Sequence, residues 1–156
     1  MFTEGTAGHP TDRAERWVIA ACALQAINTT IHHIRGALLF DTPGRYLSIV
    51  IVLCMLALPT LALAVSRRTS AGVQKAAWWT FWTASFIGFV IVFGLSEGLV
   101  THVINPLVEQ GYPADEPFDL LFQATGVLHV VPAVVAAALL THLARARRSG
   151  LFGARA

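Results

Sequence analysis

Four apolar runs, each about as long as a lipid bilayer is thick, constrain this chain more than any other feature. They cover residues 17–40, 47–65, 78–104 and 118–143, and short polar segments separate them. A helix needs roughly 20 apolar residues to cross the hydrocarbon core of a membrane. With 55% hydrophobic and 13% charged residues, the chain has too little polar surface for an ordinary soluble domain. We therefore predict an all-α integral membrane protein, folded as a four-helix transmembrane bundle with short loops.

The segments between the runs predict how the helices are oriented. Residues 41–45 contain Pro43 and Gly44, which favour a tight turn, so the first two helices must run antiparallel. Basic residues gather before the first run, after the second and after the last, whereas residues 107–117 are net acidic. Because short basic segments stay in the cytoplasm, we predict that both termini are cytoplasmic, in a bacterial-type inner membrane. The predicted parts are an N-terminal cytoplasmic segment at 1–16, a transmembrane domain at 17–143 and a basic cytoplasmic tail at 144–156.

Several classes of function are excluded by motif or by charge. The sequence contains no glycine-rich nucleotide-binding motif, no serine-nucleophile elbow, no CxxC and no HExxH. Its net charge is only +2, and its arginines lie beside apolar segments instead of forming a face of their own. We therefore predict no nucleic-acid partner.

A stripe of polar and ionisable side chains interrupts the first apolar run. Gln25, Asn28, His32 and Arg35 recur at steps of three and four residues, so a helix presents them on one face. Polar groups at membrane depth need partners, and the stripe is therefore predicted to face protein. An ionisable side chain inside a span is costly enough to indicate a functional site.

Ionisable groups on three of the predicted helices share one depth. From a helical rise of about 1.5 Å per residue, His32, Glu97 and His129 lie about 12, 11 and 16 Å below the outer surface. We predict that these three are the catalytic residues of one cavity in the outer half of the bundle. The predicted substrate-binding residues, most of them nearer its mouth, are Arg35, His102, Asp119, Gln123 and Asn28.

The third helix carries two of these groups, and their spacing limits how they can be used. Glu97 and His102 are five residues apart, which an α-helix converts into a separation of about 140°. Both can reach the interior only if they flank the inward direction of the helix. A buried carboxylate such as Glu97 must also be paired, protonated or bound to a metal.

Three classes of function fit this layer, and the first is a metal-dependent or haem-dependent oxidoreductase. Histidine with carboxylate suits iron, copper or zinc, and two histidines on facing helices suit haem b. In architecture, four helices with histidines at similar depth resemble small membrane cytochromes. The predicted metal ligands are His32, Glu97, His129 and His102.

The second class is a metal-free isomerase or cyclase acting on a lipid-soluble, sterol-like or isoprenoid-like substrate. Glu97 would donate the proton and His32 or His129 would act as base. The third class is a proton-translocating or ion-translocating protein, or an accessory subunit of a membrane complex. The absence of an internal repeat disfavours transport. We favour the metal-dependent enzyme, with the bilayer, a hydrophobic small molecule or an electron-transfer protein, and a second copy of the chain as expected partners.

Overall fold

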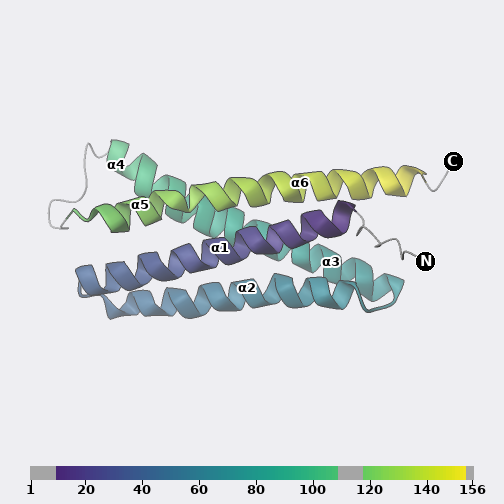
Figure 1. The fold of residues 1–156 in the computed structure, drawn as a ribbon, viewed down its shortest axis with the longest axis horizontal. Coiled ribbons are helices and arrows are strands. Elements are labelled where there is room, and N and C mark those ends of the chain that lie inside the picture. The colour runs from purple at the N-terminus through teal and green to yellow at the C-terminus, as the bar shows by residue number, and fades with distance from the viewer. Residues whose placement is uncertain (1–9, 109–117, 154–156) are drawn as a thin grey trace, which may run out of the picture.

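The computed structural model describes residues 10–108 and 118–153, which are almost entirely helical (Figure 1). The prediction of an all-α chain is confirmed for these residues, since they contain no strand. The predicted acidic segment falls mostly outside them. The elements are α1 (Pro10–Leu39), η1 (Pro43–Arg45), α2 (Tyr46–Ser66), α3 (Ala71–Ser85), η2 (Phe86–Ile104), α4 (Asn105–Val108), α5 (Leu120–Leu128) and α6 (Val130–Gly153).

These elements join into four long helical rods. The first two rods are α1 and α2, the third is α3 with η2 and α4, and the fourth is α5 with α6. The helix α1 packs against α2, α5 and α6, while η2 packs against α5 and α6. The start of α1 and the end of α6 lie at the same end of the bundle (Figure 1). Segments far apart in the sequence, 28–35 and 97–102 among them, are thereby brought to one level.

Two proline-containing segments shape the rods. Asp41 adopts a left-handed backbone conformation with φ of 50°, which Asp tolerates better than most residues, and the chain then turns through Pro43 into α2. The predicted fourth helix is divided at His129, between α5 and α6. Pro132 explains this break, because it has no N–H to donate to the carbonyl of Leu128 four residues earlier.

Three of the rods are long and apolar enough to cross a membrane. They cover Pro43–Ser66, Ala71–Val108 and Leu120–Ser149 among the described residues. The helix α1 does not belong to this group by composition, because its polar stripe and its charged first turns lower its hydropathy. Its outward face is nevertheless aliphatic, since the side chains exposed along it are Leu24, Ile27, Ile31, Ile34 and Leu38.

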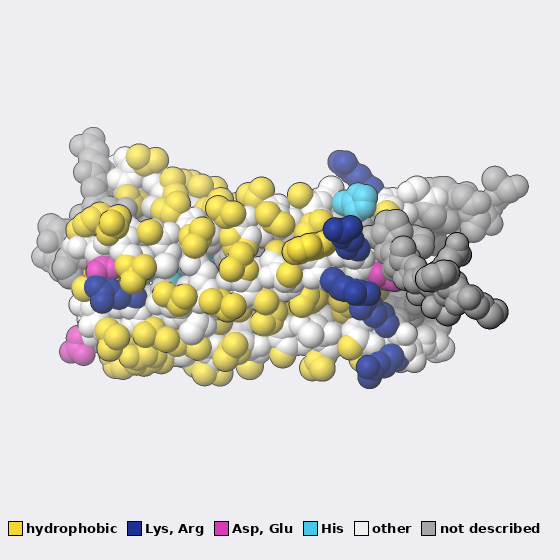
Figure 2. Space-filling view, in the orientation of Figure 1, with side chains coloured by type: hydrophobic (Ala, Val, Ile, Leu, Met, Phe, Trp, Pro, Cys, Tyr) yellow, Lys and Arg dark blue, Asp and Glu magenta, His cyan; other side chains and the backbone are white. Residues whose placement is uncertain are grey.

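The surface carries apolar side chains over most of its length. Figure 2 shows them across the middle of the visible face, with Lys and Arg gathered in a band toward the end where α1 begins. The interior beneath is divided along the bundle axis. Phe81, Phe89 and Leu140 are fully buried toward the basic end, whereas the buried histidines lie in the other half. Gly94 lets η2 approach α6 closely, because a Cβ there would meet the Cβ of Ala133 at 2.1 Å.

Candidate metal centre

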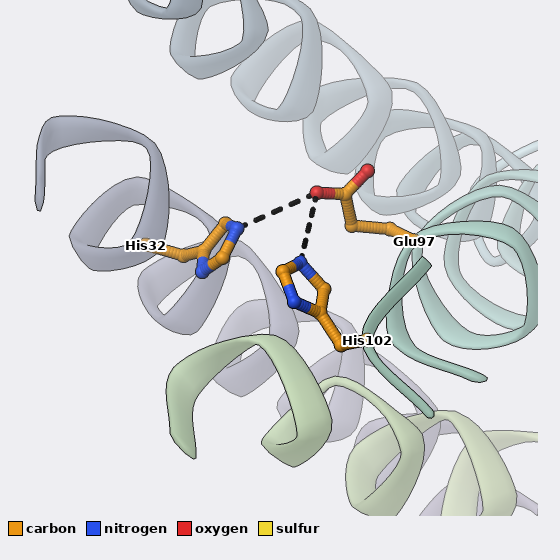
Figure 3. Close-up of side chains that lie close together, drawn as sticks. All are labelled: His32, Glu97 and His102. Atoms are coloured by element: carbon orange, nitrogen blue, oxygen red, sulfur yellow. Dashed lines mark ion pairs between the residues drawn. The ribbon is translucent and has the colours of Figure 1, made fainter. Parts of the chain in front are cut away.

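Three side chains from α1 and η2 converge in the half of the bundle away from the α2–α3 turn (Figure 3). The Nε2 atom of His32 lies 3.5 Å from Oε1 of Glu97, and Nε2 of His102 lies 3.7 Å from the same oxygen. Their ligand atoms all lie within 4.8 Å of one another. Among the described residues, this is the group of His, Cys, Asp and Glu side chains close enough to share one ion.

The winding of η2 explains why Glu97 and His102 can act together. Residues Phe86–Ile104 form a π-helix, in which backbone hydrogen bonds join residues five apart. Two bonds show this spacing: Asn105 N–H donates to the carbonyl of Val100, and the Thr101 hydroxyl donates to the carbonyl of Ser96 at 3.1 Å. The predicted separation of about 140° is therefore wrong, because it assumed α-helical winding.

Hydrogen bonds from α5 fix the orientation of both imidazole rings. Nδ1 of His32 lies 3.1 Å from the carbonyl oxygen of Phe122 and 3.2 Å from the hydroxyl of Thr125. A carbonyl oxygen only accepts, so Nδ1 of His32 carries the hydrogen and donates it. Nδ1 of His102 likewise lies 3.1 Å from Oε1 of Gln123 and donates to it. In each neutral ring, Nε2 is then left with a free lone pair.

These two lone pairs have no hydrogen to accept. Both Nε2 atoms are buried and lack a hydrogen-bond partner in the structure. Each instead faces Oε1 of Glu97, which is also an acceptor, at a distance longer than an ordinary hydrogen bond. Buried polar atoms in proteins are normally satisfied. A metal ion, protons or a water molecule placed between such acceptors supplies the positive charge or the hydrogens that they lack.

The two distances from Oε1 of Glu97 to the histidine nitrogens fit a small transition-metal ion. Nitrogen and oxygen ligands at about 2.0–2.2 Å from a tetrahedral ion lie about 3.4 Å apart. The observed separations of 3.5 and 3.7 Å are within a few tenths of an ångström of this value, and the two nitrogens lie within 4.8 Å of each other. Two histidines with one carboxylate also leave coordination positions open for a substrate.

Burial distinguishes the three residues. The side chain of His32 is 0% exposed and that of His102 is 5% exposed, whereas Glu97 is 28% exposed. Glu97 is thus the most exposed of the three side chains, and the predicted order of depth along the bundle axis is a separate matter that these exposed fractions do not test. Gly126 explains the burial of His102, because a Cβ at this position would lie 2.4 Å from the Cγ atom of the ring. The missing side chain provides the space that the ring occupies.

His129 does not join this group, although its ring centroid lies 5.3 Å from that of His32. Its Nδ1 donates to the carbonyl of Thr125 at 2.7 Å, and its Nε2 accepts from the hydroxyl of Thr29 at 3.0 Å. Asn28, a predicted substrate-binding residue, donates to the same carbonyl of Thr125 at 2.8 Å. These bonds occupy both ring nitrogens, so His129 and Asn28 bridge α1 to α5.

Arg35 and Asp119, also predicted to bind substrate, pair with each other. The Arg35 guanidinium donates to both carboxylate oxygens of Asp119, which also caps α5 by accepting from the N–H of Phe122 at 2.8 Å. The Arg35 guanidinium beside it lowers the pKa of the Asp119 carboxyl below its ordinary value. This pair fastens the end of α1 to the start of α5, and thus holds the elements that carry His32 and its partners.

Phe122 and Thr125 are contributors that the sequence did not indicate. The Phe122 ring stacks on the His32 ring with centroids 4.1 Å apart, and both residues supply acceptors to Nδ1 of that histidine. The available signal was on the same helix, where Gln123 and Gly126 share a polar face with His129. Thr125 and Phe122 lie beside that face. Every residue has a backbone carbonyl, so the residue type does not show which carbonyl accepts a hydrogen bond.

Comparisons of the chain with known protein families, curated proteins and solved structures found no match. The arrangement of His32, Glu97 and His102 is therefore the feature that bears most directly on function.

Proposed function

We propose that this chain is an integral membrane metalloenzyme that uses one transition-metal ion in oxidoreductase-type chemistry. His32, Glu97 and His102 would hold the ion. The observation that carries the proposal is the convergence of Nε2 of His32, Nε2 of His102 and Oε1 of Glu97, since both buried nitrogens lack a hydrogen-bond partner. Two histidines and a carboxylate with open positions are typical of non-haem iron(II) enzymes, so iron is the first candidate, followed by zinc and copper.

The spacing of the rings favours a small ion over haem b. Two imidazoles on opposite sides of one iron place their ring centroids about 6 Å apart, given metal–nitrogen bonds of roughly 2 Å. The centroids of His32 and His102 are 4.7 Å apart, and their planes meet at 86°. Oxygen Oε1 of Glu97 lies near both Nε2 atoms, where a macrocycle would need space.

The protein side chains have distinct tasks in this proposal. Phe122, Thr125 and Gln123 orient the histidines through Nδ1, which is the arrangement that usually supports metal-bound imidazole. A bound redox-active ion would supply one-electron chemistry. The exposed edge of Glu97 marks the side from which a substrate reaches the open positions. Since the outward faces around the bundle are apolar, we propose a hydrophobic small molecule as substrate, or an electron-transfer protein as partner.

We also propose that α1 is a fourth transmembrane helix and that both termini are cytoplasmic in a bacterial-type inner membrane. Two features support this topology. The exposed face of α1 is aliphatic while its polar face is buried against protein, as expected of a helix surrounded by lipid. Basic side chains at the starts of α1 and α3 and near the end of α6 lie at one end of the bundle.

Reporter fusions test this topology directly. A fusion at Gln74 should report a cytoplasmic location, because the α2–α3 segment is basic, and a fusion at Gln110 should report the opposite side. Activity of paired reporters, one active only in the cytoplasm and one only outside it, gives the answer at each site. A cytoplasmic signal at Gln110 would overturn the proposed orientation.

Metal analysis tests the proposed centre. We expect the protein, purified in detergent without chelators, to contain about one equivalent of iron, zinc or copper per chain, and to show no Soret band. Mass spectrometry of the elements and a visible spectrum make the two measurements. A Soret band would instead indicate haem. A folded protein that binds none of the three metals when each is supplied would favour the acid–base alternative, in which Glu97 donates a proton and His32 acts as base.

A further inference from the structure

A small pocket lies at the basic end of the bundle, far along the axis from the metal centre. Its volume is about 160 Å³, and its lining residues come from the starts of α1 and α3 and from α6: Thr11, Glu15, Trp78, Leu143, Ala146 and Arg147. The pocket therefore joins three of the four rods at the level where basic side chains gather (Figure 2).

The carboxylate in this pocket is already neutralised. Glu15 accepts from the indole N–H of Trp78 at 2.9 Å through Oε1, and from the Arg67 guanidinium at 2.9 Å through Oε2. Both oxygens thus have strong donors, and the ion pair with Arg67 cancels the negative charge. Glu15 is left to shape the wall of the pocket and to fix the Trp78 ring.

Arg147 supplies a positive charge that is not cancelled by an ion pair. Its Cζ atom lies 4.1 Å from the centroid of the Trp78 ring, so the ring orients the guanidinium by a cation–π contact. Among residues 10–108 and 118–149, no carboxylate lies within ion-pair distance of it. A half-buried arginine with a fixed planar head is well suited to bind a phosphate group.

The surroundings of the pocket combine positive charge with apolar surface. Exposed basic side chains, which we name the basic collar, lie near the start of α1, around the α2–α3 turn and near the end of α6: Arg13, Arg16, Arg67, Arg68, Lys75, Arg145 and Arg148. Along the helices, the exposed side chains of Trp17 and Trp79 come after the basic residues Arg16 and Lys75 and before exposed aliphatic side chains. This order of charge, aromatic ring and aliphatic surface matches the order of headgroup, interface and acyl chain in a leaflet.

We propose that this pocket binds the phosphate group of an anionic phospholipid from the leaflet at the basic end. Arg147 binds the phosphate, Trp78 holds the guanidinium in place, and the basic collar raises the local concentration of anionic headgroups. The acyl chains lie along the apolar surface next to the pocket. This site is separate from the metal centre, and neither depends on the other.

The test compares lipid binding by two neighbouring arginine variants of the full chain in detergent. Arg147→Gln keeps a planar polar head but removes the charge in the pocket, whereas Arg148→Gln removes an exposed charge of the collar. We expect phosphatidylglycerol, but not phosphatidylcholine, to bind the wild type and Arg148→Gln. We expect Arg147→Gln to bind it at least about fivefold more weakly, because this variant loses the charge-assisted hydrogen bonds to the phosphate. Native mass spectrometry counts the bound lipids, and a thermal melt with added lipid gives the affinity.

Each other outcome decides the matter as well. An equal loss of lipid affinity in the two variants would mean that the basic collar attracts lipid as a diffuse charge. This result would refute binding in the pocket. Equal binding of inorganic phosphate, supplied alone, would assign the pocket to a soluble anion and overturn the lipid. If Arg147→Gln does not fold, Arg147→Lys and Arg148→Lys replace the pair. Lys cannot make a bidentate contact, so weaker binding by Arg147→Lys alone supports the proposal, and equal binding refutes it.

Discussion

Replacing Glu97 by Gln should reduce metal binding by at least about 100-fold, since even the loss of an indirect partner of a metal site costs about 10- to 100-fold. Glu97 Oε1 is the atom that both histidines face, at 3.5 and 3.7 Å. Without its charge, the site keeps two neutral imidazoles and a weakly coordinating amide. Because Glu97 is partly exposed, the uncharged side chain should leave the fold intact.

The measurement is competition for the metal with a chromophoric chelator, alongside a thermal melt of each variant. Asp41→Asn is the matched control, because Asp41 is exposed and Asn tolerates its left-handed backbone conformation. This control removes the same charge in the same half of the bundle and should bind metal as the wild type does. Unchanged affinity in Glu97→Gln would show that Glu97 is not a ligand.

The substitution Gly126→Ala should weaken metal binding by more than about tenfold without altering any ligand. A Cβ at position 126 would lie 2.4, 2.5 and 2.6 Å from three atoms of the His102 ring, so the ring must leave its place. Its hydrogen bond to Gln123 would break, and Nε2 would no longer face Glu97. The expected factor of ten is the lower limit of the affinity loss that usually follows when a residue orienting a metal ligand is removed.

Gly72→Ala provides the comparison for this steric effect. No atom lies within 4 Å of a Cβ placed at Gly72, and alanine favours a helix over glycine by about 1 kcal/mol. The control should therefore bind metal normally and melt at the same temperature or higher. Wild-type affinity in Gly126→Ala would show that the ring of His102 does not need this position.

The apolar runs predicted the helices well, because hydrophobicity and length determine where a span can lie. The run 47–65 matches α2 at Tyr46–Ser66 almost residue for residue. The other helices extend beyond their runs, as α1 does by beginning at Pro10. These extensions are amphipathic or charged turns outside the apolar run, where Ala14 and Glu15 pack inward, and a hydropathy pattern does not register them.

The candidate site was predicted only in part. The position of a side chain depends on its depth along the helix and on its direction around the helix axis, and the sequence indicated only the depth. Equal depth correctly grouped His32 with Glu97 in space, but it also selected His129, whose ring nitrogens are bonded elsewhere. The direction of a side chain around the helix axis depends on the number of residues per turn, and no residue type is specific to a π-helix. His102 was therefore expected to point away from Glu97, and the structure places it 3.7 Å from the carboxylate.

The winding of η2 also changes what a recognisable motif for such a site would be. Searches for ligand pairs on helices use spacings of three and four residues, as in HExxH, because these share a face of an α-helix. Here the pair is Glu97 and His102, which are five residues apart and form the pattern Glu-x4-His. A search based on α-helical spacing does not find this pattern. The insertion or deletion of one residue between them would erase the pairing while leaving composition, hydropathy and both ligands in place. The winding of the helix, and not only the identity of the two residues, therefore determines whether Glu97 and His102 can meet.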